Sequence, residues 1–125
     1  MLPNQRPFKN PLLPAEVRFR DVHVEPWAEG GRVRVHITLA PFQKPPNIEV
    51  AISTTGGEEV ASASIIETMT LKSVFTMHLR GAYLSGEYHL TARLYYPDMD
   101  DVDHTELNFG MPSSGDENNA PPQNP

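Results

Sequence analysis

The sequence predicts an all-β protein, a two-sheet Greek-key sandwich of seven strands. Short runs of alternating apolar and polar residues are separated by proline and glycine, and no convincing amphipathic helix is present. The chain has 125 residues and 13 prolines, too many for a helical protein of this size, because each interior proline costs a helix about 3 kcal/mol. A sandwich of eight strands is the alternative.

Three strands are expected in the first half, at residues 16–25, 32–39 and 48–52. In the first, the apolar phase changes between Phe19 and Val22, which predicts a β-bulge because one extra residue shifts the alternation. The second strand alternates most regularly. Prolines then form the loop before the third strand.

Residues 58–68 are ambiguous. Their alanines and glutamates suit a helix, whereas the valine, the isoleucines and the preceding Thr-Thr-Gly-Gly turn favour an edge strand. We favour the strand.

Further strands are expected at 71–80, 86–96 and 102–109. The predicted core consists of Val17, Phe19, Val22, Val24, Val33, Val35, Ile37, Leu39, Ile48, Val50, Ile52, Phe75, Met77, Leu79, Tyr88, Leu90, Ala92, Leu94, Leu107 and Phe109.

The strand at 86–96 carries the most informative pattern. Tyr88 follows a glycine and precedes inward positions at 90, 92, 94 and 96, which resembles the tyrosine corner of the immunoglobulin-like β-sandwich superfamily. The resemblance covers roughly residues 16–110 and implies an immunoglobulin-like or fibronectin III-like topology, with an eight-stranded C2-like sandwich as the alternative. The cysteine pair and the core tryptophan of antibody domains are absent, so the resemblance implies topology only.

Composition divides the chain into three parts. Residues 1–15 are expected to form an extended, proline-rich arm whose latter part lies along the domain, residues 16–110 the sandwich, and residues 111–125 a disordered tail. The chain has no apolar signal-like segment and no membrane-spanning stretch, so a cytoplasmic location is expected.

Catalysis is not expected, because none of the common nucleophile, phosphate-binding, zinc-protease or dinucleotide motifs is present. The sequence indicates no cofactor, and the absence of cysteine excludes thiolate sites. A net charge of −6 argues against nucleic acid. The expected function is therefore a protein-interaction or assembly module, an accessory subunit of a larger complex, and a homo-oligomer is compatible with this.

One sheet face is the expected contact surface. If 16–25, 32–39 and 71–80 are neighbouring strands, their outward positions gather basic and imidazole side chains that suit an acidic protein partner. These residues are Arg18, Arg20, His23, Arg32, Arg34, His36, His78 and Arg80. The three histidines also raise the question of Zn²⁺ or Cu²⁺, although a structural site normally needs three or four ligands.

The alternative function is a ligand-binding sandwich for calcium or carbohydrate. Asp98, Asp100, Asp101 and Asp103 are the calcium candidates, since loops at the ends of sandwiches can supply carboxylate ligands. Their spacing lacks the EF-hand pattern, and no bound metal is expected. A sugar surface would use Trp27, Tyr95 and Tyr96 with the loop at 98–103.

Overall fold

The computed structural model describes residues 11–28, 31–80 and 86–111, and within these it is an all-β sandwich of seven strands. The strands are β1 (Phe19–Pro26), β2 (Arg32–Leu39), β3 (Asn47–Thr54), β4 (Glu59–Ile65), β5 (Lys72–His78), β6 (Gly86–Tyr95) and β7 (Asp103–Met111). A short 3₁₀ turn, η3 (Pro14–Glu16), precedes them. The seven-stranded prediction is confirmed, and the eight-stranded alternative is not supported in the described residues.

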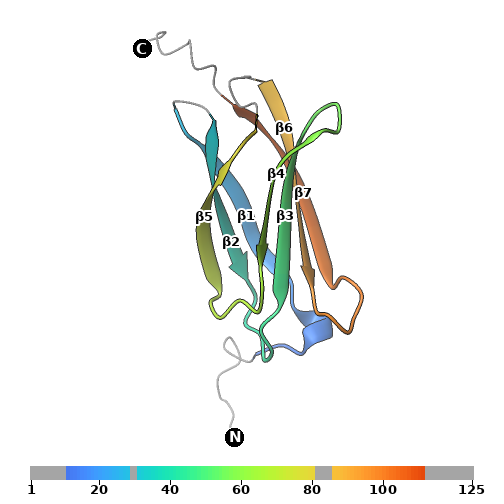
Figure 1. Cartoon of the computed structure of the whole chain (residues 1–125). Coiled ribbons are helices and arrows are strands. Elements are labelled where there is room, and N and C mark those ends of the chain that lie inside the picture. Colours follow the sequence, from blue (N-terminus) through green and yellow to red (C-terminus); the bar gives the residue numbers. More distant parts are fainter. Residues whose placement is uncertain (1–10, 29–30, 81–85, 112–125) are drawn as a thin grey trace, which may run out of the picture.

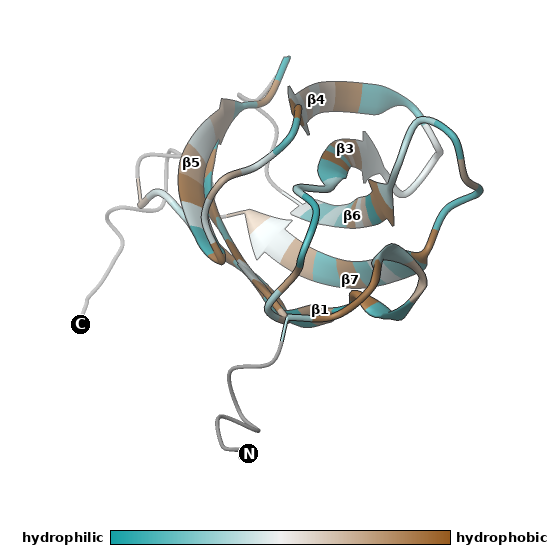
Figure 2. Ribbon diagram, turned by 90° about the horizontal axis from the view of Figure 1, so that it is seen from below, coloured by the Kyte–Doolittle hydropathy of each residue, from teal (hydrophilic) through white to brown (hydrophobic). Residues whose placement is uncertain are grey.

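Two antiparallel sheets form the two layers (Figure 1). One has the order β1-β2-β5 and the other β4-β3-β6-β7. The fourth strand thus pairs with the third, not with the fifth as in immunoglobulin constant domains. Seen from below, β1 lies beside β7, where the two sheets meet (Figure 2).

The core lies between the sheets and follows the predicted alternation. Leu90, Val35 and Ile52 are fully buried, and most of the predicted residues belong to the same cluster. Phe19, Val22, Val24, Phe75, Leu107 and Phe109 are half-buried and pack against its rim. They lie on the outermost strands of the sheets, where one side of each strand faces water. Val60, Ala61 and Tyr96 also belong to the buried set.

Two local predictions about β-strands are confirmed. The register between β1 and β2 shifts between Phe19 and Asp21, which is the bulge expected at Arg20. Residues 59–65 form β4 and pair with β3. Ala61 is buried and belongs to the core cluster. The alanine that suits a helix thus serves here as a small side chain that lets the edge strand β4 pack closely on the core.

The ends of the sandwich are held by contacts outside the ladders. Leu12 forms a bridge with Phe42, and the carboxylate of Glu16 accepts from the backbone N–H of Leu13 at 3.1 Å. Met111 is buried at the other end. Of the predicted arm at 1–15 and the predicted tail at 111–125, residues 1–10 and 112–125 lie outside the described residues. In the part that is described, there is no helix with the length and hydropathy to cross a bilayer.

Tyr88 is buried and stacks on Phe109, with ring centroids 5.8 Å apart. Its hydroxyl bond to the backbone, the defining contact of a tyrosine corner, stays a prediction.

Candidate functional site

The outward side chains of β1, β2 and β5 form what we call the three-stranded face. The register places His23 beside His36, Glu25 beside Arg34, and Arg32 beside His78. Alternation therefore brings together five of the eight predicted contact residues, as expected.

The other three predicted residues are placed differently. Arg18 precedes β1, and its guanidinium donates to the carbonyls of Ala15 and Val17. Arg20 is the exposed bulge residue at the end of the face. The expectation that Arg80 lies on this face is wrong, because Arg80 follows β5 and donates to the carbonyls of Glu59 and Val60 on β4.

The three-stranded face is not purely basic. Asp21 and Glu25 alternate with the predicted residues on β1, and each carboxylate engages one histidine. His23 lies 2.5 Å from Asp21, and His36 lies 2.8 Å from Glu25. The hydrogen bond with His36 lowers the pKa of Glu25. Sequence reasoning overlooked these carboxylates, although the same alternation places them outward.

The histidines do not form a metal site. The rings of His23 and His36 stack with centroids 4.3 Å apart and an angle of 10° between planes, so their nitrogens do not point at a common centre. His78 pairs with Arg32 at the other end of the face. Among the residues described, no three histidine or carboxylate side chains are grouped so that they could hold a metal ion.

A shallow hollow of about 370 Å³ lies at the Trp27 end of this face, lined by Glu25, Pro26, Trp27 and Arg34. Trp27 is held in place twice. Its backbone N–H donates to the backbone carbonyl of Arg32, and the guanidinium of Arg32 lies 4.1 Å from the centroid of its ring. The hollow therefore has a fixed aromatic wall with a carboxylate and a guanidinium beside it.

Arg18, Arg32 and Arg80 are engaged within the protein, whereas Arg20 and Arg34 have no such contact among the described residues. Of the last two, Arg34 is the one that lines the hollow. It is exposed, and the described residues offer it no hydrogen bond, ion pair or ring contact. Glu25, directly opposite on β1, is hydrogen-bonded to His36. The five N–H donors of Arg34 are thus available to a ligand.

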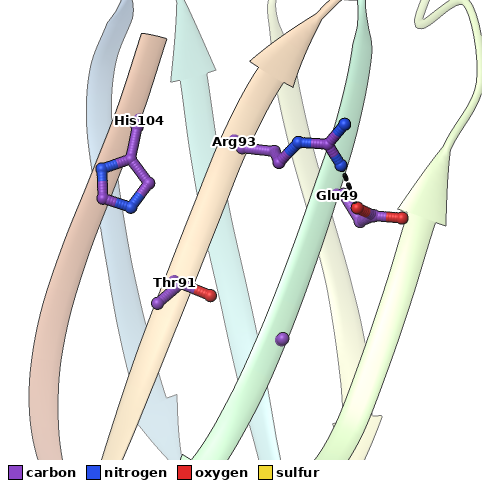
Figure 3. Close-up of a pocket in the computed structure, with 5 residues that line it drawn as sticks. Glu49, Thr91, Arg93 and His104 are labelled. Carbon is purple, nitrogen blue, oxygen red and sulfur yellow. Dashed lines mark hydrogen bonds and ion pairs between the residues drawn. The ribbon is translucent and has the colours of Figure 1, made fainter. Parts of the chain in front are cut away.

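The opposite surface, the four-stranded face, consists of the outward side chains of β4, β3, β6 and β7. It contains a second hollow, of about 240 Å³, lined by Glu49, Ala51, Thr91, Arg93 and His104. In Figure 3, Arg93 reaches from β6 toward Glu49 on β3, while His104 projects from β7 on the other side. Sequence reasoning did not single out this group.

Several charged groups of the four-stranded face pair with one another, although the exposed Glu87 of β6 has no such partner among the described residues. Arg93 pairs with Glu49 and with Asp101, whose hydrogen bond raises the pKa of the guanidinium. Each carboxylate oxygen of Glu106 pairs with one imidazole. Oε1 lies 3.0 Å from Nε2 of His89, and Oε2 lies 3.2 Å from Nε2 of His104. The alternation of 86–95 and 103–111 places all these side chains outward, but only the register between strands identifies the pairs.

The calcium candidates do not converge. Asp101 is paired with Arg93. Asp103 accepts from the backbone N–H of Phe19 at 2.9 Å and from that of His104 at 2.8 Å. Asp98 and Asp100 are exposed. Two of the four carboxylates therefore hold the sandwich together and do not face a common point.

The predicted sugar surface is corrected by burial. Tyr96 is only 1% exposed and cannot serve as a platform. Tyr95 lies on β6 beneath the guanidinium of Arg93, 4.2 Å from its ring centroid. Trp27 belongs to the other sheet, so the two remaining aromatics do not form one surface.

No protein-family profile matches this chain, and no curated protein is similar to it. Solved structures do resemble it. β-Glucuronidase from Parabacteroides merdae has a TM-score of 0.62 at 18% identity, over 77% of this chain and 14% of that one. β-Glucuronidase from Bifidobacterium dentium, complexed with coumarin-3-O-glucuronide, has a TM-score of 0.61 at 16% identity, over 78% and 19%.

A glycosyl hydrolase family 2 member from Bacteroides cellulosilyticus gives a TM-score of 0.57 at 18% identity, over 76% of this chain and 15% of the enzyme. The chain thus spans less than a fifth of the length of each of these enzymes. At such low identity the likeness concerns the fold alone. It shows a β-sandwich of a kind that also occurs as a part of larger glycosidases.

Proposed function

We propose that this chain is a non-catalytic interaction module that binds an acidic group of a partner protein at the Trp27 end of the three-stranded face. The observation that carries the proposal is the exposed guanidinium of Arg34, which makes no hydrogen bond or close ion pair within the described residues and lies beside a hollow with an aromatic wall. The carboxylate of Glu25 attracts it, but that carboxylate is hydrogen-bonded to His36. On the opposite face, by contrast, the guanidinium of Arg93 is already paired with two carboxylates.

The chemistry of the hollow suits a short segment of protein. A carboxylate of the partner would accept two parallel hydrogen bonds from Arg34, the geometry that guanidinium favours. An apolar side chain next to it would cover Trp27 and Pro26. Because Arg32 already fixes Trp27 and His36 already engages Glu25, little side-chain freedom is lost on binding.

The small share of the similar structures that this chain covers agrees with a module. The likeness covers 14% to 19% of the larger enzymes, which agrees with a sandwich that works as one part of an assembly. The two hollows are shallow and open, and in the described structure no hydrogen bond joins the hydroxyl of Thr91, in the second hollow, to a base.

The test is capture of the partner that co-purifies with the native protein, followed by its binding to variants. Arg34→Glu should weaken capture at least about tenfold, because it places like charge against an acidic group. Lys72→Glu is the matched control, since Lys72 lies on the same face but away from the hollow. Added salt should weaken the wild-type complex. Capture that survives Arg34→Glu and ignores salt would show that this hollow is not the contact.

A second candidate is an acidic carbohydrate. The hollow combines an aromatic wall with a guanidinium, and one of the similar enzymes is complexed with a glucuronide. Trp27 is the only tryptophan of the chain, so its fluorescence reports directly on the hollow. Glucuronate should change the emission of the wild type but not of Arg34→Glu, and glucose should change neither. A flat titration with glucuronate would remove this candidate.

A further inference from the structure

The outer edge of β5 carries an exposed apolar side chain at its centre. β5 is the last strand of the three-stranded sheet and pairs only with β2 among the described residues. Val74 lies near its middle and is 57% exposed. Ile66, Met69 and Leu71, in the segment leading into β5, are also exposed. Most of the large apolar side chains that the described residues expose thus lie within 66–74.

The ladder with β2 fixes which backbone groups face this edge. Leu39 donates to Leu71, and Leu79 donates to Gly31, so the odd-numbered residues of β5 are bonded to β2. Because the direction of backbone groups alternates along a strand, the N–H and C=O of Val74 and Thr76 point away from β2. These groups have no partner in the described structure.

Both ends of this edge are capped by the chain itself. The hydroxyl of Thr70 donates to the carbonyl of Lys72 at 2.9 Å. At the other end, the N–H of Arg80 donates to the carbonyl of Val60 on β4 at 2.9 Å. The open part of the edge is therefore short, runs from Lys72 to Thr76 and is centred on Val74. The carbonyl of Lys72 keeps a second lone pair for a further donor.

The remaining edge strands are better protected. β1 contains the bulge and ends in Pro26, and β1 and β7 lie against each other. β5 has a smaller contact of this kind, with β4. β4 has two carbonyls covered by Arg80. Bulges, prolines and covering side chains are the usual means of preventing strands from pairing between molecules. β5 carries one charge, Lys72, at its start, and no proline.

We propose that β5 pairs with β5 of a second copy of this chain, antiparallel, with Val74 on the two-fold axis. In this register each Val74 exchanges two hydrogen bonds with its counterpart, and the two exposed valines cover each other. Lys72 lies opposite Thr76 of the other copy, so no like charges oppose one another. The edge of β5 can pair with the edge of β5 in a second copy, because a two-fold symmetric contact uses the same surface of both copies.

The pairing would join two three-stranded sheets edge to edge. Both outer faces would stay open, so the inference does not depend on the function proposed for the Arg34 hollow. Since the paired edge is short, association should be weak and visible only at high concentration.

The test begins with sedimentation equilibrium on the full chain, up to about 1 mM because small interfaces associate weakly. The wild type should approach a dimer. Thr76→Pro removes an edge N–H without touching the ladder to β2 and should raise the dissociation constant at least about tenfold, whereas Thr76→Ala keeps the N–H and should leave it nearly unchanged. A wild type that stays monomeric at every concentration would overturn the proposal. That result would also be found if a different protein occupied this edge.

A cysteine test checks the register. The chain has no cysteine, so Val74→Cys introduces a single thiol. Directly opposed residues that exchange both hydrogen bonds have Cα atoms about 5.5 Å apart, within the range of a disulfide. Mild oxidation should therefore give a covalent dimer with Val74→Cys and none with Thr38→Cys, which lies outward on the central strand β2. Equal yields from both variants, or a yield from Val74→Cys that Thr76→Pro does not lower, would overturn the two-fold pairing at Val74.

Discussion

At the scale of single residues, the two neighbouring tyrosines after Leu94 have different roles. Tyr96 is buried, and its hydroxyl donates to the carbonyl of Lys44 at 2.7 Å, which ties the end of β6 to the loop before β3. Tyr95 is half-buried under Arg93. The alternation predicts the inward position of Tyr96, but the bond to Lys44 depends on a loop conformation that no sequence pattern specifies.

We expect Tyr96→Phe to lower the free energy of unfolding by about 1 kcal/mol, because it removes one buried hydrogen bond and leaves a carbonyl unpaired. Tyr95→Phe is the control and should change little, since the described residues offer the Tyr95 hydroxyl no hydrogen bond. Urea unfolding measures both. Equal losses from the two variants would contradict the role of the Lys44 contact.

Burial raises the pKa of Tyr96 above its ordinary value of 10.0. The unfolded chain therefore loses this proton at lower pH than the folded chain does. The contribution of Tyr96 to stability is complete below the unfolded pKa and is lost as pH rises through the folded pKa. Melting curves of the wild type and Tyr96→Phe should accordingly converge above pH 10. A gap between the curves that stays constant there would refute the expectation.

At the scale of elements, the alternation predicted which residues each strand buries, but not which strands pair. The bulge at Arg20 and the burial of Leu90 follow from local phase alone. The pairing of β4 with β3, and the ion pairs of the four-stranded face, depend on register between distant segments. The same alternation predicts that Asp21 and Glu25 point outward on β1. A prediction of the charge on a sheet face must therefore include the outward acidic residues as well as the basic ones.

Leu90 tests the phase of β6. It is fully buried, so Leu90→Ala should cost about 2 to 5 kcal/mol through lost burial and the cavity left behind. Thr91→Ala, one position along on the outer face, should cost far less. Chemical denaturation measures the free energy of unfolding of both variants. Similar losses of this free energy would contradict the inward position of Leu90.

The connection between β4 and β5 contains one strained residue. Glu67 has a φ of 50°, the one positive value for a non-glycine residue in the described chain, and its N–H donates to Asn47 at 2.7 Å. Left-handed backbone costs an ordinary residue roughly 1 kcal/mol. Glycine at position 67 should therefore be more stable than alanine there by about 1 kcal/mol.

Glu59 provides the comparison, because it is exposed, lies in β4 and does not have a positive φ. At position 59 alanine should be more stable than glycine, which reverses the order at position 67. The same order at both positions in urea unfolding would exclude strain at Glu67.

At the scale of the whole molecule, the two faces of the sandwich differ in how their charges are used. On the four-stranded face Arg93 is paired with two carboxylates, whereas on the three-stranded face Arg34 makes no hydrogen bond or close ion pair within the described residues. Composition alone reports only a net charge of −6. The difference arises from folding, because partners such as Arg93 and Asp101 are assigned by loop geometry.

Calcium should not affect the melting temperature of the whole domain. Asp101 and Asp103 are engaged within the sandwich, so the loop at 98–103 offers no shared centre to an ion. A ligand that bound the folded state would raise the melting temperature by mass action. Thermal unfolding in millimolar Ca²⁺ and in EDTA should coincide, and a shift reversed by EDTA would contradict this reading.

The direction of the outermost strands has a mechanical consequence. In Figure 1, β1 starts at the lower end of the sandwich, whereas β7, running in the same direction, ends at the upper end. Tension applied across the module would draw β1 downward along the β2 ladder and β7 upward along the β6 ladder. Hydrogen bonds perpendicular to such a pull share the load and must yield together, unlike bonds that open one by one. Pulling the two ends of the described sandwich apart should therefore load the β1–β2 and β6–β7 ladders in shear.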